Sequence, residues 1–369
     1  MKIISVKCVV VRGFRRKVFG RDSITALGTG DISKHAIVLI ETNAGVTGFG
    51  EIASCFPRRG ALLAAEVDEV LTPSLLGQDP REITRLIRLM DGLLYGSEPA
   101  KAGIEMALWD ILGKELSTPV YQLLGGKVRD RISLSHSITF GTPDEMAVFA
   151  CERVAEGFRT VKAKVGQGHE RDVAAVKAIR EAIGYDKRLR VDANMAWNSA
   201  KDAITVIRAM EPYRPEMIEQ PVAAYELDMM AEIRRSVQTP ILADESVWGP
   251  RDAAAVIRHS AADVINVYVA ESGGISKARH IFEMCDSFGL GCLIGAMPEF
   301  GIGTAAQIHL GIAVPNLGYD SDTCGVLYHD EDLLLKPLRI EGGYAYAPEG
   351  PGLGVEIDMS VLERWSTPR

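Results

Sequence analysis

The 369-residue sequence lacks any apolar run of the roughly 18–20 residues that a membrane-spanning helix needs. Its first residues, Met1 to Val6, have the pattern of a strand and carry no signal-peptide core or cleavage site. The chain also lacks a basic excess, since its formal net charge is −8, whereas a nucleic-acid surface needs a basic stripe. We therefore expect a cytoplasmic protein that binds neither membranes nor nucleic acids.

The sequence is also poor in the cysteine patterns that mark zinc sites and disulfide-rich domains. No CxxC pair is present, and no His/Cys cluster has the spacing of a zinc site. Scattered thiols are typical of a reducing compartment, so we expect the six cysteines to be reduced. A GxGxxG fingerprint after an early strand is absent as well, which disfavours a doubly wound dinucleotide-binding sheet.

The first region, about residues 1–125, begins with strand-like segments and continues with helical ones. A turn at Asn43-Ala44-Gly45 between two strand-like segments predicts a hairpin. Strands followed by helices predict an α+β domain. The predicted strands cover 1–11, 35–42 and 46–51, and the predicted helices cover 61–76, 80–95 and 99–114.

The second region, residues 126–328, alternates strand-like and helical segments. Repeated β-α units imply a parallel sheet, and about seven or eight of them suit a closed β/α barrel better than the alternative, an open doubly wound sheet. The last region, residues 329–369, is expected to fold back on the first. The predicted barrel strands cover 132–139, 160–165, 189–193, 217–220, 241–244, 264–269 and 292–296.

Two lysines stand at the end of one predicted barrel strand. Residues two apart on a strand point to the same face, so Lys162 and Lys164 project together, either into the barrel or outward to its helices. Inside the barrel, burial and mutual repulsion would lower a lysine pKa and make that amine a usable base. Solvated lysines are the alternative, although barrel active sites form at the C-terminal ends of the strands.

Three carboxylates, Asp192, Glu219 and Asp244, end the next three predicted strands. Taken singly, each could cap a helix or form a salt bridge. Together they supply hard oxygen ligands of the kind that Mg²⁺ prefers. A metal beside a lysine base suits removal of a proton next to a substrate carboxylate, because the ion neutralises the charge of the resulting enolate.

These motifs resemble those of the enolase superfamily, specifically the muconate lactonizing enzyme subgroup of the mandelate racemase/muconate lactonizing enzyme family. The resemblance covers nearly the whole chain and implies a modified (β/α)7β TIM barrel with an N-terminal α+β capping domain that the C-terminal tail completes. The segments similar to the family's metal motifs and sixth-strand turn are Val191-Asp192-Ala193-Asn194, Glu219-Gln220-Pro221, Asp244-Glu245-Ser246 and Ser272-Gly273-Gly274-Ile275.

The resemblance also implies roles for individual residues. Lys164 would be the base, Lys162 would lie near the metal-bound carboxylate and lower the pKa of Lys164, and Asp192, Glu219 and Asp244 would hold one Mg²⁺ per subunit. The substrate would be a small carboxylate, and the protein would be a homo-oligomer, either a dimer or an octamer. The further residues expected to contact the substrate are Asn194, Asn266 and Glu299, of which Glu299 could instead be a capping carboxylate.

One position departs from the family pattern. The family's racemases and epimerases carry a second lysine on the sixth strand, where this chain has Tyr268. A tyrosine is a poor base at neutral pH but can donate a proton, so one base and one acid fit this chain better than two bases. Elimination of water needs that combination, with Lys164 as base and Tyr268 as acid. A packing role for Tyr268 is the alternative.

The resemblance places substrate specificity in two loops of the first region, at about 13–30 and 53–60, where Phe19 and Phe56 would contact the substrate. The preferred hypothesis is a dehydratase of a hydroxylated amino or imino acid such as cis-3-hydroxy-L-proline. The alternatives are a racemase or epimerase of an amino-acid derivative (proline betaine, an N-acyl amino acid or a dipeptide), a cycloisomerase, and a carboxylate-binding protein without turnover.

Overall fold

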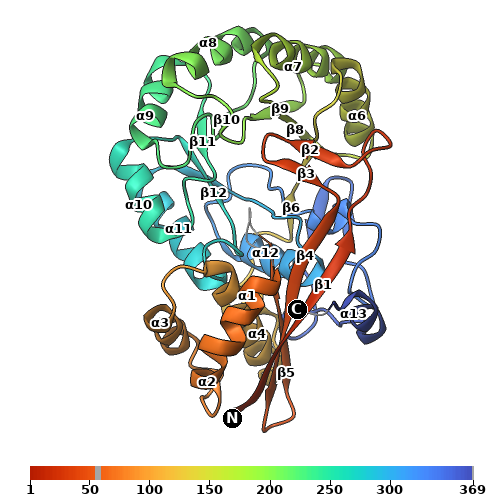
Figure 1. Cartoon of the computed structure of the whole chain (residues 1–369), viewed down its shortest axis with the longest axis vertical. Helices are drawn as coiled ribbons and strands as arrows, with labels where there is room; N and C mark the ends of the chain where they lie inside the picture. Colours follow the sequence, from red (N-terminus) through yellow and green to blue (C-terminus); the bar gives the residue numbers. More distant parts are fainter. Residues whose placement is uncertain (55–59, 368–369) are drawn as a thin grey trace.

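The computed structural model describes residues 1–54 and 60–367. Its N-terminal part is a three-stranded antiparallel sheet in the order β1-β4-β5, with helix α4 packed on it (Figure 1). The strands are β1 (Ile3–Phe14), β4 (Ile32–Thr42) and β5 (Thr47–Ile52). The helices are α1 (Gly60–Glu66), a π-helical turn η1 (Val67–Leu71), α2 (Thr72–Leu75), α3 (Ile83–Leu93), α4 (Glu98–Glu115) and α5 (Val120–Leu123).

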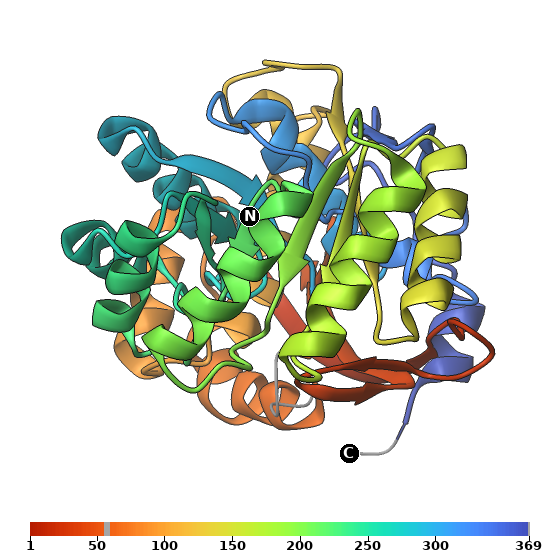
Figure 2. The same cartoon turned by 90° about the horizontal axis from the view of Figure 1, so that it is seen from above.

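Seven parallel strands in the order β7 to β13 curve into a barrel with helices around the outside (Figures 1 and 2). The barrel strands are β7 (Ser135–Ile138), β8 (Thr160–Lys164), β9 (Arg188–Asp192), β10 (Ile218–Glu219), β11 (Ile241–Ala243), β12 (Val264–Val267) and β13 (Gly291–Ile294). The helices are α6 (Pro143–Ala155), α7 (His169–Ile183), α8 (Ala200–Met210), α9 (Leu227–Ser236), α10 (Pro250–His259), α11 (Ile275–Phe288) and α12 (Gly301–Ala313).

A closing segment, residues 318–322, completes the ring between β13 and β7. The backbone N–H of Asp322 donates to the carbonyl of Ile294 on β13 (2.8 Å). On the other side, the N–H of Ser135 on β7 donates to the carbonyl of Ser321 (2.9 Å). The closing segment therefore takes the place of an eighth strand, and the predicted (β/α)7β barrel is confirmed.

Side chains alternate along each barrel strand, which directs the charged residues inward. On β8, Val161 and Ala163 belong to the core between strands and helices, so Lys162 and Lys164 face the barrel interior. The strand register aligns Lys164 with Asp192, and Asp192 with Glu219. Three neighbouring strands thus bring their charged ends to one row at the C-terminal mouth of the barrel.

The C-terminal region returns to the N-terminal one, as predicted. Helix α13 (Met359–Trp365) lies beside β1, and the N–H of Thr367 donates to the carbonyl of Val10 (2.9 Å; Figure 1). The hairpin of β14 (Ile340–Glu341) and β15 (Tyr344–Tyr346) pairs with β6 (Arg131–Ser133).

The predicted strand at 132–139 is wrong as a single element, because its first part pairs with this hairpin before the barrel begins at Ser135. None of the described helices is long and apolar enough to cross a bilayer. Among the cysteines that the structure describes, Cys151, Cys285, Cys292 and Cys324 are free thiols.

Buried carboxylates of the capping domain cap helices of the barrel. Helix α11 has Gly274 at its N-cap and no side-chain cap of its own. Glu105, fully buried on α4, accepts hydrogen bonds from the N–H groups of Ile275 (2.8 Å) and Ser276 (2.9 Å). Glu51 on β5 does the same for α12, accepting from the N–H groups of Phe300 and Gly303 (both 2.8 Å). Each carboxylate satisfies otherwise unpaired donors and holds the two domains together.

We expect Glu105→Ala to lower the free energy of unfolding by about 3 kcal/mol, because buried N–H donors would lose a charged acceptor. Urea denaturation of the variant and the unchanged protein measures the difference. Glu283→Ala, an exposed glutamate on the same helix α11, is the control and should leave the midpoint nearly unchanged. Equal midpoints for Glu105→Ala and the unchanged protein would contradict this capping role.

Candidate active site

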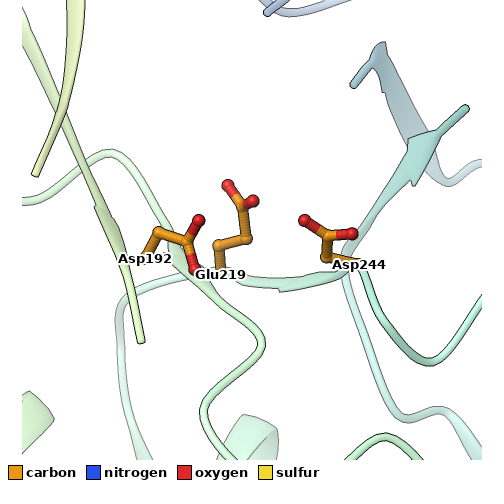
Figure 3. A group of neighbouring side chains, drawn as sticks. All are labelled: Asp192, Glu219 and Asp244. Atoms are coloured by element: carbon orange, nitrogen blue, oxygen red, sulfur yellow. The ribbon is translucent and has the colours of Figure 1, made fainter. Parts of the chain in front are cut away.

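Three carboxylates meet at the barrel mouth. Asp192 and Glu219 end β9 and β10, and Asp244 directly follows β11. Figure 3 shows their carboxyl groups turned to one shared space, with Glu219 between the other two. One oxygen from each lies within 4.8 Å of the others, and all three residues are buried.

The oxygens of this triad fit a hard divalent cation. Glu219 Oε2 and Asp244 Oδ1 are buried and have no hydrogen-bond partner among the described residues. Neither aspartate caps the helix that follows it, since α8 is capped by Ser199 and the Asp244 side chain bonds to Tyr268 and Asn266. The helix-cap alternative is therefore excluded for both. An all-oxygen set of carboxylates is the donor set that Mg²⁺ prefers over a soft metal.

The two lysines lie against this triad. Lys162 Nζ donates to Glu219 Oε1 (3.0 Å) and also to the carboxylate of Asp322 in the closing segment. Lys164 Nζ lies 2.5 Å from Asp192 Oδ2 and 2.9 Å from Asn194 Oδ1. The interior orientation is therefore the right one of the two that the sequence left open.

Without a cation, both lysines hold their protons firmly. Burial would lower the pKa of Lys162, but the carboxylates of Asp322 and Glu219 outweigh burial and hold that pKa well above its ordinary value. For Lys164, burial and then Asp192 are the main influences, and the net pKa is raised. Lys162 lowers the pKa of Lys164, in the predicted direction, but in the cation-free arrangement the charge of Asp192 outweighs this repulsion and the net pKa is raised.

Two of the three carboxylates, in contrast, lie in surroundings that disfavour their charged form. Burial, followed by repulsion from Glu245 and Glu271, raises the pKa of Asp244 to about 8. Burial and the charge of Asp192 raise the pKa of Glu219 well above its ordinary value. Two of the three carboxylates are therefore poorly compensated, and a cation between them would supply the missing positive charge.

A cavity of about 620 Å³ opens above the triad, between the barrel and the capping domain. The capping side of the wall comes from β4, from Arg15 and Arg16, and from the hairpin of β2 (Ser23–Thr25) and β3 (Gly28–Gly30). The hairpin is tied to the barrel by the N–H of Ile24, which donates to Thr139 Oγ1 (2.6 Å). The barrel side of the wall includes Lys162, Lys164, Asn194, Asp244, Glu245 and Tyr268.

Tyr268 lies across the barrel from the lysines. Tyr268 follows β12. In a ring of seven strands and the closing segment, β12 is four positions from β8, so β12 and β8 lie on opposite sides of the barrel. Its hydroxyl donates to Asp244 Oδ2 (2.9 Å), and its ring fills the space beside Gly295, where a Cβ atom would lie 2.3 Å from the ring. Burial, followed by Asp244, raises the Tyr268 pKa well above its ordinary value. The residue both packs and presents a polar group to the cavity.

The other predicted substrate contacts divide into two groups. Asn194 lines the cavity and bridges Lys164 to Glu245, to which its Nδ2 donates (2.9 Å). Asn266 lies behind the wall, with Nδ2 3.3 Å from Asp244 Oδ2. Glu299 is buried beside the wall residues Met297 and Pro298, and accepts from the N–H of Met297 rather than capping α12.

Of the two predicted aromatic contacts, Phe19 is not brought to the cavity. Its ring packs against Phe149 of α6, with ring centroids 5.7 Å apart, and lies close to Gly141. The hairpin that follows it reaches the cavity instead. Phe56 lies outside the residues that the structure describes.

Sequence reasoning missed the carboxylate of Asp322. It lines the cavity and contacts Lys162 and Ser135. Asp320-Ser321-Asp322 continues the series of charged strand ends, and that spacing was the available signal. The signal was missed because the closing segment has no strand-like apolar pattern.

Comparison with known proteins decides the family. The model of the mandelate racemase/muconate lactonizing enzyme N-terminal domain matches residues 14–125, and that of the enolase C-terminal domain-like family matches residues 145–361. The chain belongs to the mandelate racemase/muconate lactonizing enzyme family of the enolase superfamily. It is therefore an enzyme of that superfamily, and the resemblance drawn from its motifs is confirmed.

Two relatives have different activities. The chain is 39% identical to a hydrophobic dipeptide epimerase from Enterococcus faecalis over 85% of this chain and 89% of that one. It is 33% identical to muconate cycloisomerase 1 from Rhodococcus opacus over 89% and 90% of the two chains.

Solved structures show the same likeness. An N-succinyl Arg/Lys racemase from Bacillus cereus is 30% identical with a TM-score of 0.95, covering 100% of this chain and 99% of that one. The Enterococcus faecalis dipeptide epimerase, complexed with Mg and L-Leu-L-Tyr, is 34% identical with a TM-score of 0.89, covering 96% of this chain and 99% of that one.

Proposed function

We propose that this enzyme removes the α-proton of a small carboxylate substrate with the help of Mg²⁺ and then eliminates water from it. The substrate class would be hydroxylated amino or imino acids, of which cis-3-hydroxy-L-proline is an example. One observation supports elimination over racemisation: the wall opposite Lys164 carries the phenol of Tyr268, and both residues line the same cavity. An amine can take a proton, whereas a phenol whose pKa is raised keeps its proton at neutral pH and can serve as a donor but not as a second base.

Asp192, Glu219 and Asp244 would hold the ion. When bound, Mg²⁺ supplies positive charge beside the substrate carboxylate, which stabilises the negative charge that develops there. If Asp192 were a ligand of the ion, Lys164 would lose the contact that raises its pKa and its amine could act as a base. Lys162 would remain protonated between Glu219 and Asp322 as a fixed positive charge.

The proposed elimination uses one proton acceptor and one proton donor. Lys164 takes the α-proton, the bond from the β-carbon to its hydroxyl breaks, and a double bond forms between the α- and β-carbons. Tyr268 gives its proton to the departing hydroxyl, which leaves as water. Solvent then removes the proton from Lys164 and returns one to Tyr268, so the cycle closes with no other reactant.

An epimerase or racemase is the second candidate, because the relative 39% identical to this chain is a dipeptide epimerase. A cycloisomerase is a weaker one, carried by the 33% identical relative. Incubation with Mg²⁺ in D₂O distinguishes the dehydratase from the epimerase. Hydroxyprolines that lose water to an imine or 2-oxo product support the dehydratase. Proline betaine, N-acyl amino acids or dipeptides recovered with α-deuterium and inverted configuration support the epimerase and contradict elimination.

We expect Tyr268→Phe to separate the two halves of the reaction. Loss of the acid should slow release of water by about 10²–10⁴-fold, while exchange of the α-proton in D₂O continues, because Lys164 is untouched. Product formation and deuterium content are measured on the same samples. Because Tyr268 also contacts Asp244, the Mg²⁺ affinity of the variant is measured as a control. Wild-type rates of dehydration in Tyr268→Phe would exclude Tyr268 as the acid.

A further inference from the structure

A second group of carboxylates lies beside the metal triad and is not used by the reaction above. Glu271, in the turn after β12, is fully buried, and neither of its carboxylate oxygens has a hydrogen-bond partner among the described residues. Glu245 lines the cavity, with one oxygen bonded to Asn194 and the other, Oε2, buried and unpartnered. The negative charges of Glu245 and Glu299 both contribute to raising the pKa of Glu271.

Such an arrangement is costly unless a cation completes it. A buried carboxylate without partners costs several kcal/mol relative to one in water. Burial and the neighbouring carboxylates raise the pKa of Glu271 well above its ordinary value, and no lysine or arginine is among the groups that act on it. A positively charged group placed between Glu271 and Glu245 would satisfy the unpartnered oxygens of both.

The spacing of these carboxylates favours an organic cation over a second metal ion. Among the residues that the structure describes, only Asp192, Glu219 and Asp244 bring oxygens within 4.8 Å of one another in the manner of a metal site. One wall of the second group is apolar, because Ala270, next to Glu271, packs with Trp248 and Met297. Separate acceptors beside an apolar wall suit an ammonium carried on carbon, whose N–H groups point in several directions.

The position of the group indicates which atom of the substrate would carry this charge. Asn194 bridges the two side chains: its Oδ1 accepts from the Lys164 amine and its Nδ2 donates to the Glu245 carboxylate, both at 2.9 Å. Lys164 would face the α-carbon, so an atom bonded to the α-carbon comes within reach of Glu245. The α-nitrogen is that atom in an amino or imino acid.

We propose that Glu271 and Glu245 recognise a positively charged nitrogen on the α-carbon, so that the substrates are free amino or imino acids rather than N-acylated amino acids or dicarboxylates. This inference rests on the proposed role of Lys164 and Mg²⁺. It separates this chain from a dipeptide epimerase, whose reacting carbon carries a neutral amide nitrogen when it belongs to the C-terminal residue.

Two ligands of equal shape test the charge directly. L-Proline and (S)-tetrahydrofuran-2-carboxylate share ring and carboxylate and differ only in NH₂⁺ against oxygen. Calorimetric titration of the Mg²⁺-loaded full-length enzyme should show proline binding at least about tenfold more tightly, the effect of a charge-assisted hydrogen bond. Equal affinities, tighter binding of the oxygen analogue, or no measurable binding of either overturns the proposal.

Glu271→Gln keeps the shape of the side chain and removes its charge. We expect it to weaken proline at least about tenfold and to leave the oxygen analogue nearly unchanged. Its urea midpoint without ligand should stay close to that of the unchanged enzyme, because the raised pKa keeps Glu271 uncharged when no cation is bound. A lower midpoint with equal loss of both ligands would show a structural role and overturn the proposal. Glu283→Gln, exposed on α11, is the matched control and should alter neither affinity.

The charge test and the catalytic test can fail separately. Exchange of the α-proton in D₂O with N-acylprolines, but not with free proline or hydroxyprolines, would reject the cation site and leave the role of Lys164 intact. Discrimination of proline from its oxygen analogue, without exchange in any substrate, would reject the role of Lys164 and retain the cation site.

Discussion

Replacing Lys164 with alanine is expected to reduce turnover by about 10³–10⁴-fold, because the amine is the only proposed proton acceptor for the α-carbon. Exchange of the α-proton in D₂O should be lost in parallel, since exchange needs the same base. The Mg²⁺ affinity should remain close to that of the unchanged enzyme, because Asp192, Glu219 and Asp244 are all still present. Product formation, deuterium content by NMR and calorimetric Mg²⁺ titration measure the three effects.

A matched control and a rescue experiment sharpen this prediction. Lys177→Ala removes a solvent-exposed lysine from α7, the helix after β8, and should retain full activity. Adding methylamine should restore part of the activity of Lys164→Ala, because a small amine can enter the space that the side chain leaves. Persistent turnover in Lys164→Ala would show that another group is the base. Loss of Mg²⁺ binding in the same variant would show that Lys164 supports the metal site instead.

Removing the central carboxylate of the triad is expected to have the second large effect. Glu219→Gln should weaken Mg²⁺ by more than about 100-fold, since mutations of groups behind the ligands already cost 10–100-fold. Activity at ordinary Mg²⁺ concentrations should disappear with it. In the unchanged enzyme, Mg²⁺ at about 100 times its dissociation constant should raise the free energy of unfolding by about 2.7 kcal/mol, and this gain should be absent from Glu219→Gln.

Urea denaturation over a series of Mg²⁺ concentrations, with EDTA as the metal-free reference, measures this gain. Glu232→Gln on α9, the helix that follows the strand of Glu219, is the control and should keep the full Mg²⁺ effect. A stabilisation by Mg²⁺ that survives in Glu219→Gln would place the ion elsewhere in the protein.

The meeting of the three carboxylates at the barrel mouth could be predicted from the sequence because its geometry follows from local rules. Asp192, Glu219 and Asp244 each stand at a strand end, and neighbouring parallel strands bring such ends together. The pKa of Lys164 could not be predicted in the same way. The pattern Lys162-Ala163-Lys164 shows the repulsion between the lysines but not the Asp192 oxygen 2.5 Å from the Lys164 amine.

Contacts between distant segments were beyond prediction for a related reason. Glu51 caps α12 from a position 249 residues earlier than Phe300, and nothing near either residue marks the pair. Glu271 precedes the Ser272-Gly273-Gly274 turn and resembles any polar turn residue in sequence. Only its complete burial without partners sets it apart. Asp322 was missed because its segment has no alternating apolar pattern. The segment joins the barrel only through backbone hydrogen bonds to the strands on both sides.

We propose that one divalent ion binds among Asp192, Glu219 and Asp244, next to the Lys164 amine. Anomalous diffraction from crystals soaked in Mn²⁺ tests it without knowledge of the substrate. We expect a single strong peak bounded by oxygens of these three residues, with Lys164 turned to the same space and released from Asp192. A peak elsewhere, or none among the three carboxylates at saturating Mn²⁺, would contradict the proposed metal site.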